Sequence, residues 1–159
     1  MNYFAYGSNL LDAELLRDGV RAERIGKARL DGYQLQFTRC SRKRKGGVAD
    51  IVRTGNQKDV VWGFVYDITE EGARRLDAKE GVPTHCERIE VSPVMGPDGT
   101  TETCLSYTVK NKESYHVPPT RDYLSGIVRG ANEKALPPDY IAVLEKIKTA
   151  PPRDCAEAD

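Results

Sequence analysis

The chain has 159 residues and a formal net charge of zero, with 24 basic and 24 acidic side chains. This length suits one domain that buries a full core without metals or disulfides. The balanced charge argues against a protein built to bind nucleic acid or an anionic membrane, because such proteins carry a basic excess. The N-terminus lacks the pattern of a signal peptide, and no stretch is apolar enough to span a bilayer. We therefore expect a cytoplasmic protein.

The four cysteines are Cys40, Cys86, Cys104 and Cys155, and none of them forms a C-x-x-C motif. This spacing argues against a zinc site or a redox pair. In a reducing compartment we expect all four to be free thiols. Cys86 and Cys104 are interpreted as packing residues on neighbouring strands, not directly opposite one another.

The N-terminal half of the chain predicts strands around a short helix. Residues 2–6 predict a buried strand, and Gly7-Ser8-Asn9 is a turn sequence. Asp12 is the candidate N-cap of a helix over residues 13–18. Further strand patterns cover residues 23–38, broken at Asp31-Gly32, and residues 48–52, with a basic loop at 39–47 between them.

The strongest strand pattern covers residues 60–68, which are apolar on both faces. Such a strand is central, and its Gly63 predicts the close approach of another backbone or a ligand. Thr69 is expected to cap a helix that ends near Lys79. Strands are then expected at 88–94 and 103–109, joined by a turn at 96–99.

Two helices are predicted near the C-terminus, each with an apolar stripe and each started by prolines, at Pro118-Pro119 and at Pro137-Pro138. Residues 153–159 are expected to form a disordered tail behind a single domain of residues 1–152. Strands early in the chain and helices late predict an α+β fold, with helices around a largely antiparallel sheet or barrel.

Three segments carry residue types that could form a site. The backbone N–H groups at the end of the first strand, around residues 6–9, could cradle a carboxylate or an oxyanion, although a plain strand–helix turn is the commoner use of such a sequence. Glu80 lies where a helix ends beside Gly81 and could point into a cavity or be an ordinary solvated charge. Tyr123, in the first turn of a helix, could offer its hydroxyl to a pocket or be a half-buried aromatic residue.

Other patterns point less clearly to chemistry. No histidine has a partner at metal-ligand spacing, and Ser8 does not lie in a G-x-S-x-G nucleophile motif. Cys40 lies among basic residues that would lower its pKa, so a cysteine nucleophile is possible, but no histidine is identifiably placed to assist it. The basic run at 39–45 could contact RNA or guide an anionic substrate, although a solvated mobile loop is its commoner role.

Together these segments resemble the γ-glutamylcyclotransferase family over nearly the whole chain. The matching blocks, in chain order, are Tyr6-Gly7-Ser8-Asn9-Leu10, Ala28-Arg29-Leu30, Gly46-Gly47-Val48-Ala49, residues 61–66, residues 76–82, Pro118-Pro119-Thr120 with Tyr123, and Leu136-Pro137-Pro138-Asp139-Tyr140. The family often carries a tyrosine soon after the Glu-Gly pair, where this chain has His85 and Cys86. The leaving-group side of the pocket is therefore expected to differ.

The resemblance implies a small mixed β-barrel flanked by helices, with one cavity. It also implies a lyase or acyltransferase reaction of the kind used in glutathione metabolism: a γ-glutamyl group cyclises to 5-oxoproline and releases an amine or amino acid. It implies no metal, no cofactor and a possible homodimer. Glu80 would be the catalytic residue. The substrate would be bound by Tyr3, Phe4, Ala5, Tyr6, Gly7, Ser8, Asn9 and Tyr123.

Several alternatives remain open at this point. The Gly-Ser-Asn-Leu form of the turn favours the branch of the family that acts on γ-glutamyl amino acids or peptides. The same core would suit a γ-glutamylamine, or the removal of a γ-glutamyl protecting group from a larger amine. From other classes, the candidates are a non-catalytic binding protein on the same fold and an RNA-contacting protein that uses residues 39–45.

Overall fold

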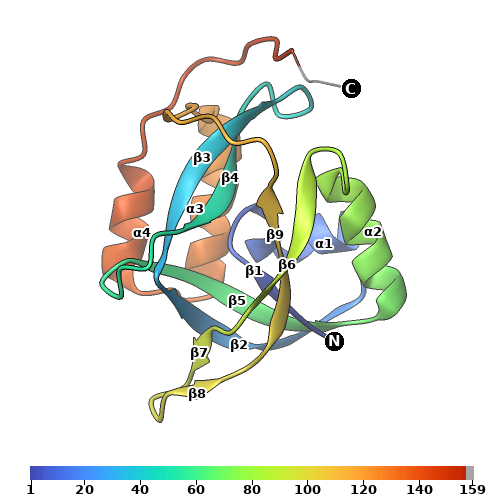
Figure 1. The fold of residues 1–159 in the computed structure, drawn as a ribbon, viewed down its shortest axis with the longest axis vertical. Helices are drawn as coiled ribbons and strands as arrows, with labels where there is room; N and C mark the ends of the chain where they lie inside the picture. The colour runs from blue at the N-terminus through green and yellow to red at the C-terminus, as the bar shows by residue number, and fades with distance from the viewer. Residues whose placement is uncertain (157–159) are drawn as a thin grey trace.

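The structure, a computed structural model, describes residues 1–156 as a curled sheet flanked by helices (Figure 1). The sheet has seven strands in the order β6-β9-β1-β5-β2-β7-β8, and β3 and β4 form a separate two-stranded hairpin. The strands are β1 (Asn2–Ala5), β2 (Ala22–Asp31), β3 (Tyr33–Ser41), β4 (Gly46–Arg53), β5 (Val60–Ile68), β6 (Cys86–Val91), β7 (Val94–Met95), β8 (Thr100–Thr101) and β9 (Cys104–Val109). The helices are η1 (Ser8–Leu10), α1 (Asp12–Arg17), α2 (Glu70–Glu80), α3 (Arg121–Glu133) and α4 (Pro138–Glu145).

The first strand lies inside the sheet, between β5 and β9. It pairs antiparallel with β5 and parallel with β9, so the sheet is mixed. The predicted central strand at residues 60–68 is confirmed, and so is the close approach at Gly63. A Cβ atom added there would lie 2.3 Å from the carbonyl oxygen of Ala5, which leaves room for glycine alone. The end of β1 is thereby held rigidly from both sides.

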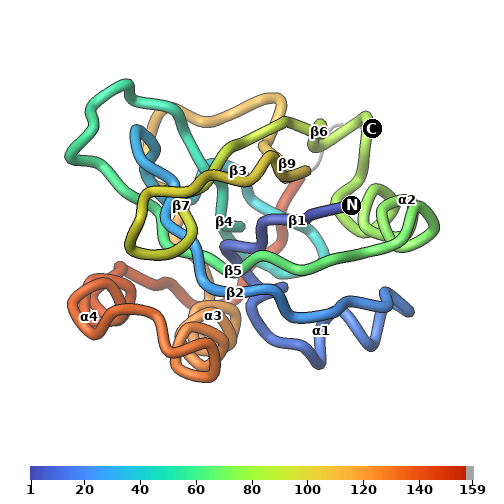
Figure 2. Tube along the Cα trace, turned by 90° about the horizontal axis from the view of Figure 1, so that it is seen from below, coloured from blue at the N-terminus to red at the C-terminus, as the bar shows by residue number. Residues whose placement is uncertain are grey.

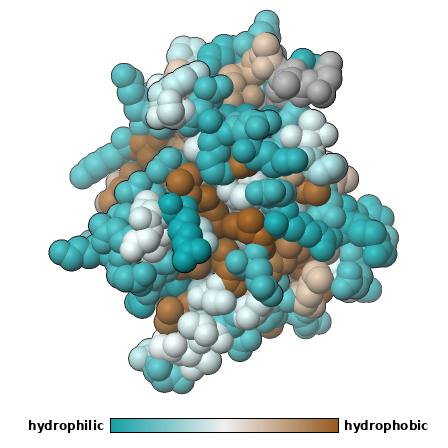
Figure 3. Space-filling view, viewed as in Figure 1, coloured by the Kyte–Doolittle hydropathy of each residue, from teal (hydrophilic) through white to brown (hydrophobic). Residues whose placement is uncertain are grey.

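Helices α1, α3 and α4 lie on one side of β2 and β5, while β6 and β9 lie on the other (Figure 2). Strand alternation divides the side chains of β1 between two cores. Tyr3 and Ala5 pack with the helices, in the cluster that includes Leu124 and Ile127. Phe4 packs in the second cluster, with Val61 and Val65. Figure 3 shows apolar surface gathered near the middle of one face, with hydrophilic side chains around it.

A buried carboxylate joins the hairpin to the sheet where no backbone ladder does. Asp50 of β4 is fully buried and accepts hydrogen bonds from Thr108 Oγ1 at 2.8 Å and Val109 N at 3.1 Å, both on β9. It also accepts one from Thr38 Oγ1 of β3 at 2.9 Å. These bonds satisfy the buried charge and curl the structure into a partial barrel. The predicted α+β class is confirmed.

Two local predictions are wrong. The segment at 39–47 is mostly strand, because Arg39 pairs with Val48 and Ser41 with Gly46 across a short turn. Asp12 does not cap α1; Leu11 occupies the N-cap position and Asp12 lies inside the first turn. The Asp12 carboxylate binds Arg24 and Lys134 instead. The cap of α2 is as predicted, since the Thr69 side chain accepts from Gly72 N.

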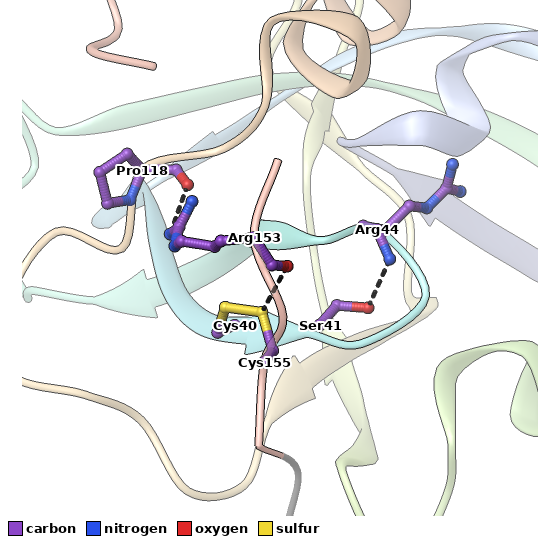
Figure 4. Close-up of a disulfide and its surroundings, with 6 residues drawn as sticks. All are labelled: Cys40, Ser41, Arg44, Pro118, Arg153 and Cys155. Carbon is purple, nitrogen blue, oxygen red and sulfur yellow. Dashed lines mark hydrogen bonds between the residues drawn. A yellow bond between two sulfur atoms is a disulfide. The ribbon is translucent and has the colours of Figure 1, made fainter. Parts of the chain in front are cut away.

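The predicted free thiols and disordered tail are also contradicted in part. Cys40 and Cys155 form a disulfide (Figure 4). The tail is further held by Arg153, whose backbone N–H donates to Lys45 O at 3.0 Å and whose guanidinium donates to Pro118 O at 2.9 Å. Residues 157–159 of the predicted tail lie outside the described residues. Because its sulfur is bonded to another sulfur, Cys40 is not an available nucleophile.

Cys86 and Cys104 are free and buried, as predicted. They lie on the neighbouring strands β6 and β9, where Cys86 is opposite Val109 and Cys104 is opposite Val91. In the part of the chain that the structure describes, no helix is long and apolar enough to cross a membrane.

Candidate active site

A cavity of about 80 Å³ lies at the end of β1, where several segments distant in sequence meet. The end of β1 with the following turn, the β3–β4 hairpin, the end of α2, the strands β6 and β9 and the start of α3 all contribute residues. The lining residues that carry polar chemistry are Tyr3, Tyr6, Ser8, Asn9, Arg39, Ser41, Lys43, Arg44, Lys79, Glu80, Cys86, Tyr107 and Tyr123. The cavity therefore brings together most of the predicted site residues.

Glu80 is the last residue of α2, and its carboxyl group lines the cavity. The helix ends there because Gly81 adopts φ 70°, a left-handed conformation that favours glycine. Burial raises the pKa of Glu80, and the nearby charges of Lys79, Arg44 and Arg39 lower it in part. The carboxyl group is thus placed in a cavity and held above its ordinary pKa, as a residue that exchanges protons requires.

The turn after β1 presents backbone to the same cavity. Gly7 precedes the short helix η1, and no side chain caps that helix. The first N–H groups of such a turn have no partner inside it, so they can serve a bound anion or carbonyl. A Cβ at Gly7 would lie 3.4 Å from Ala49 Cβ and 3.9 Å from the Tyr123 hydroxyl, which shows how closely the turn faces the hairpin and α3.

Three tyrosines predicted to bind substrate line the cavity. The hydroxyl of Tyr3 accepts from Asn9 Nδ2 at 2.8 Å, and the hydroxyl of Tyr6 donates to Tyr107 O at 2.7 Å. The hydroxyl of Tyr123 accepts from Ala49 N at 3.1 Å. Burial raises the pKa of Tyr123 to about 12, so its hydroxyl stays protonated and keeps a hydrogen to donate.

Phe4 and Ala5, also predicted as substrate-binding residues, do not line the cavity. Both are fully buried, Phe4 in the second core cluster and Ala5 in the core beneath the helices. Strand alternation explains the position of Phe4, because it points to the opposite face of the sheet from Tyr3.

A charged network beneath the turn was not predicted from the sequence. Lys79 lies 2.7 Å from Asp18 Oδ2 and 3.3 Å from Glu14 Oε2, and it donates to Asn9 Oδ1 at 2.6 Å. Arg44 lies 5.2 Å above the ring of Tyr123 and 3.4 Å from the same Glu14 oxygen. No local sequence pattern signals this network, because Lys79 is far from Glu14 and Asp18 in the chain.

The basic run is therefore not simply a solvated loop, since Arg39 and Arg44 line the cavity. Cys86, one of the two residues that stand where the resemblance led us to expect a tyrosine, also lines it, and burial, reinforced by the charge of Glu80, raises the pKa of its thiol to about 12. Among residues 1–156, no group of three His, Cys, Asp or Glu side chains is arranged to hold a metal ion.

Comparison with known proteins agrees with this arrangement. A model of the AIG2-like family matches residues 60–144. The chain is 35% identical to human γ-glutamylcyclotransferase over 156 residues, which covers 96% of this chain and 79% of the human protein. It is 30% identical to a putative γ-glutamylcyclotransferase of Bacillus subtilis over 95% of this chain and 53% of that protein.

A solved structure of a γ-glutamyl cyclotransferase superposes with a TM-score of 0.85 at 34% identity, covering 94% of this chain and 89% of that one. The similarity thus extends over nearly the whole fold. The chain belongs to the AIG2-like family, the family of these γ-glutamylcyclotransferases.

Proposed function

We propose that this protein is a γ-glutamylcyclotransferase that converts a γ-glutamyl amide into 5-oxoproline and a free amine or amino acid. The substrate's α-amine attacks the γ-carbonyl carbon, a five-membered ring closes, and the bond to the leaving nitrogen breaks. The reaction is intramolecular, so holding the substrate in a near-attack geometry supplies much of the rate enhancement. The enzyme must further move a proton and stabilise the carbonyl oxygen.

Glu80 is the group proposed to move the proton. The α-amine is largely protonated at neutral pH and cannot attack until it loses a proton. Glu80 takes that proton and later gives it to the departing nitrogen, so one carboxyl group serves both steps. The ring nitrogen loses a second proton as the lactam forms, and this proton also ends on the released amine, which leaves as an ammonium ion. The observation that carries this proposal is the placement of Glu80 in the cavity, where burial raises its pKa above the ordinary value of a carboxyl group.

The turn and Tyr123 are proposed to bind the substrate. The N–H groups of the uncapped turn would hold the carbonyl oxygen that gains charge, since the turn residues Gly7, Ser8 and Asn9 line the cavity. The Tyr123 hydroxyl, whose oxygen is already occupied by Ala49 N–H, has its hydrogen left to donate to the glutamyl group. Arg39, Lys43 and Arg44 give the hairpin side of the cavity a positive potential that suits a carboxylate-bearing substrate.

The proposal is tested by incubating the protein with γ-glutamyl dipeptides and γ-glutamylamines and measuring 5-oxoproline. Glu80→Gln should lower kcat by about 10²- to 10⁴-fold, because it removes the proton-transfer group while keeping the shape of the side chain. Glu70→Gln, an exposed acid on the same helix, is the matched control and should match wild type. If Glu80→Gln turns over at the wild-type rate, Glu80 is not the proton carrier.

The same assay separates the alternatives. A wild-type protein that binds γ-glutamyl compounds but forms no 5-oxoproline would be the non-catalytic binding protein. A preference for γ-glutamylamines or for larger amines would identify those branches. The proposal also includes a cytoplasmic location, a role in glutathione metabolism and a homodimer. Cell fractionation, the glutathione level of a deletion strain and sedimentation velocity test these three points.

A further inference from the structure

A buried lysine stands behind the turn that borders the cavity. The side chain of Lys79 is 7% exposed, and its ammonium group has three acceptors nearby. They are Asn9 Oδ1 at 2.6 Å, Asp18 Oδ2 at 2.7 Å and Glu14 Oε2 at 3.3 Å. An ammonium group has three hydrogens and no lone pair, so Lys79 can only donate. It donates to Asn9 and Glu14 and forms an ion pair with Asp18.

This arrangement fixes the orientation of the Asn9 amide. Because Lys79 can only donate, the oxygen of that amide must face it, and the NH₂ group must face the other way. That NH₂ group donates to the Tyr3 hydroxyl at 2.8 Å. The oxygen of Tyr3 is therefore used as an acceptor, and its hydrogen must point elsewhere. Within residues 1–156 no acceptor for that hydrogen lies within hydrogen-bond distance, whereas Tyr3 lines the cavity beside Glu80.

Resting on the function proposed above, we infer that Lys79 is a positioning residue which, through Asn9, makes the Tyr3 hydroxyl a hydrogen-bond donor to the reacting carbonyl oxygen. Lys79 lines the cavity, but its ammonium group is held by Asn9, Glu14 and Asp18, so it acts on the reaction through Asn9. It sets the direction of one amide, and that amide sets the direction of one hydroxyl. Tyr3 then donates a hydrogen bond to the carbonyl oxygen that gains negative charge as the ring closes, together with the N–H groups of the turn.

The electrostatics of the site add a second expected effect. The charged groups around Lys79 come from three elements. Glu14 of α1 and Asp18, which follows it, face Lys79, and Arg44 of the hairpin lies beside Glu14. Glu80 follows Lys79 directly in α2. Burial raises the pKa of Glu80, and Lys79 is first among the cations that lower it. Removing Lys79 should raise that pKa. The acidic limb of the kcat/KM profile, which follows deprotonation of Glu80, would then move to higher pH.

The decisive experiment changes the direction in which the Tyr3 hydroxyl donates its hydrogen, without removing a side chain. Asn9→Asp keeps the size of the residue and its bond to Lys79, but a carboxylate cannot donate to Tyr3. The Tyr3 hydroxyl would then donate to the introduced carboxylate and lose its direction toward the substrate. We expect Tyr3→Phe and Asn9→Asp each to lower kcat, measured on the plateau of its pH profile, by about 10²-fold. The double variant should lose no more than either single variant.

Lys79→Met tests the origin of the orientation, with Arg75→Gln on the exposed side of the same helix as its control. Lys79→Met should lower the plateau kcat by about 10-fold in the wild-type background and not at all in the Tyr3→Phe background. Additive losses in these cycles, or a fully active Asn9→Asp, would overturn the inference. Thermal melts report folding, and if Lys79→Met does not fold, Asn9→Asp decides the question. A wild-type enzyme that forms no 5-oxoproline would instead reject the proposed function.

Discussion

Two buried lysines hold opposite sides of the turn between β1 and α1, and their surroundings differ. Lys134, which follows α3, has a fully buried side chain that donates to Leu10 O at 2.7 Å and lies 2.8 Å from Asp12 Oδ1. Its ammonium group lies 5.4 Å from the centre of the Phe64 ring. Lys79, from α2, binds the side chain of Asn9 instead.

The two sites show that burial of a charge does not by itself mark a functional residue. Lys134 binds a main-chain carbonyl and a carboxylate away from the cavity, so its loss should change stability and not the chemistry. Lys79 binds the side chain of Asn9, which itself lines the cavity, so its loss should also change the rate of the reaction. Variants on the cavity side of the turn should therefore behave differently from variants on the α3 side. The largest effect is expected on the cavity side and the smallest at Asp12.

On the cavity side, the Cys40–Cys155 disulfide joins residues 115 positions apart and lies next to Arg39. Cys40→Ser should lower the free energy of unfolding by about 2–5 kcal/mol, because the bond restricts the unfolded chain. Urea unfolding of wild type and variant measures this. Reductant should shift wild type to the midpoint of Cys40→Ser and leave the variant unchanged. Equal midpoints for oxidised and reduced wild type would contradict the prediction.

On the α3 side, Gly130 packs directly on the turn. A Cβ there would lie 2.6 Å from Leu10 Cβ and 2.9 Å from Leu10 C, so Gly130→Ala must push α3 away. We expect a loss of about 1–3 kcal/mol in stability with an unchanged pH profile of activity. Gly126→Ala in the same helix is the control, since its Cβ would meet Leu11 Cδ1 at an ordinary 3.9 Å. That variant should be neutral or slightly stabilised, by up to about 1 kcal/mol.

The smallest effect concerns Asp12, the partner of Lys134. Burial acts to raise its pKa, but hydrogen bonds from Lys134, Arg24 and Tyr66 prevail and lower it to about 2. The ordinary value is about 3.9, so this carboxylate stabilises the folded state above that pH and loses the contribution as pH falls toward 2. Acid unfolding followed by circular dichroism should therefore begin at higher pH in Lys134→Met. Asp12→Asn should flatten the dependence between about pH 4 and 2.

Much of the fold could be predicted because the local patterns agree with the tertiary structure. Residues 60–68 were predicted as a central strand and form β5, and Thr69 caps the next helix as expected. Only the inner ends of the hairpin strands, residues 39–41 and 46–47, were missed, because they flank a run of basic residues whose composition favoured a loop. The disulfide was missed because spacing alone cannot show that positions 40 and 155 meet.

The roles of the candidate site residues stay predictions, whereas their positions can be compared with the structure. Glu80, the turn and Tyr123 meet in one cavity, as the resemblance implied, while Phe4 points away because side chains alternate along β1. The network of Lys79, Glu14 and Asp18 could not be predicted, because each of these residues alone has the pattern of a solvated helix charge. What determines their role is the packing of α1 against the end of α2, which no local pattern reports.

The position of β1 has a consequence for synthesis on the ribosome. This strand leaves the ribosome before its neighbours in the sheet, which come from residues 60–68 and 104–109. Until both have left the exit tunnel, an aromatic-rich segment has no pairing partner, and contacts this distant in sequence form slowly. Nascent chains arrested before residue 104 should consequently be bound by chaperones and cut readily by protease near their N-terminus.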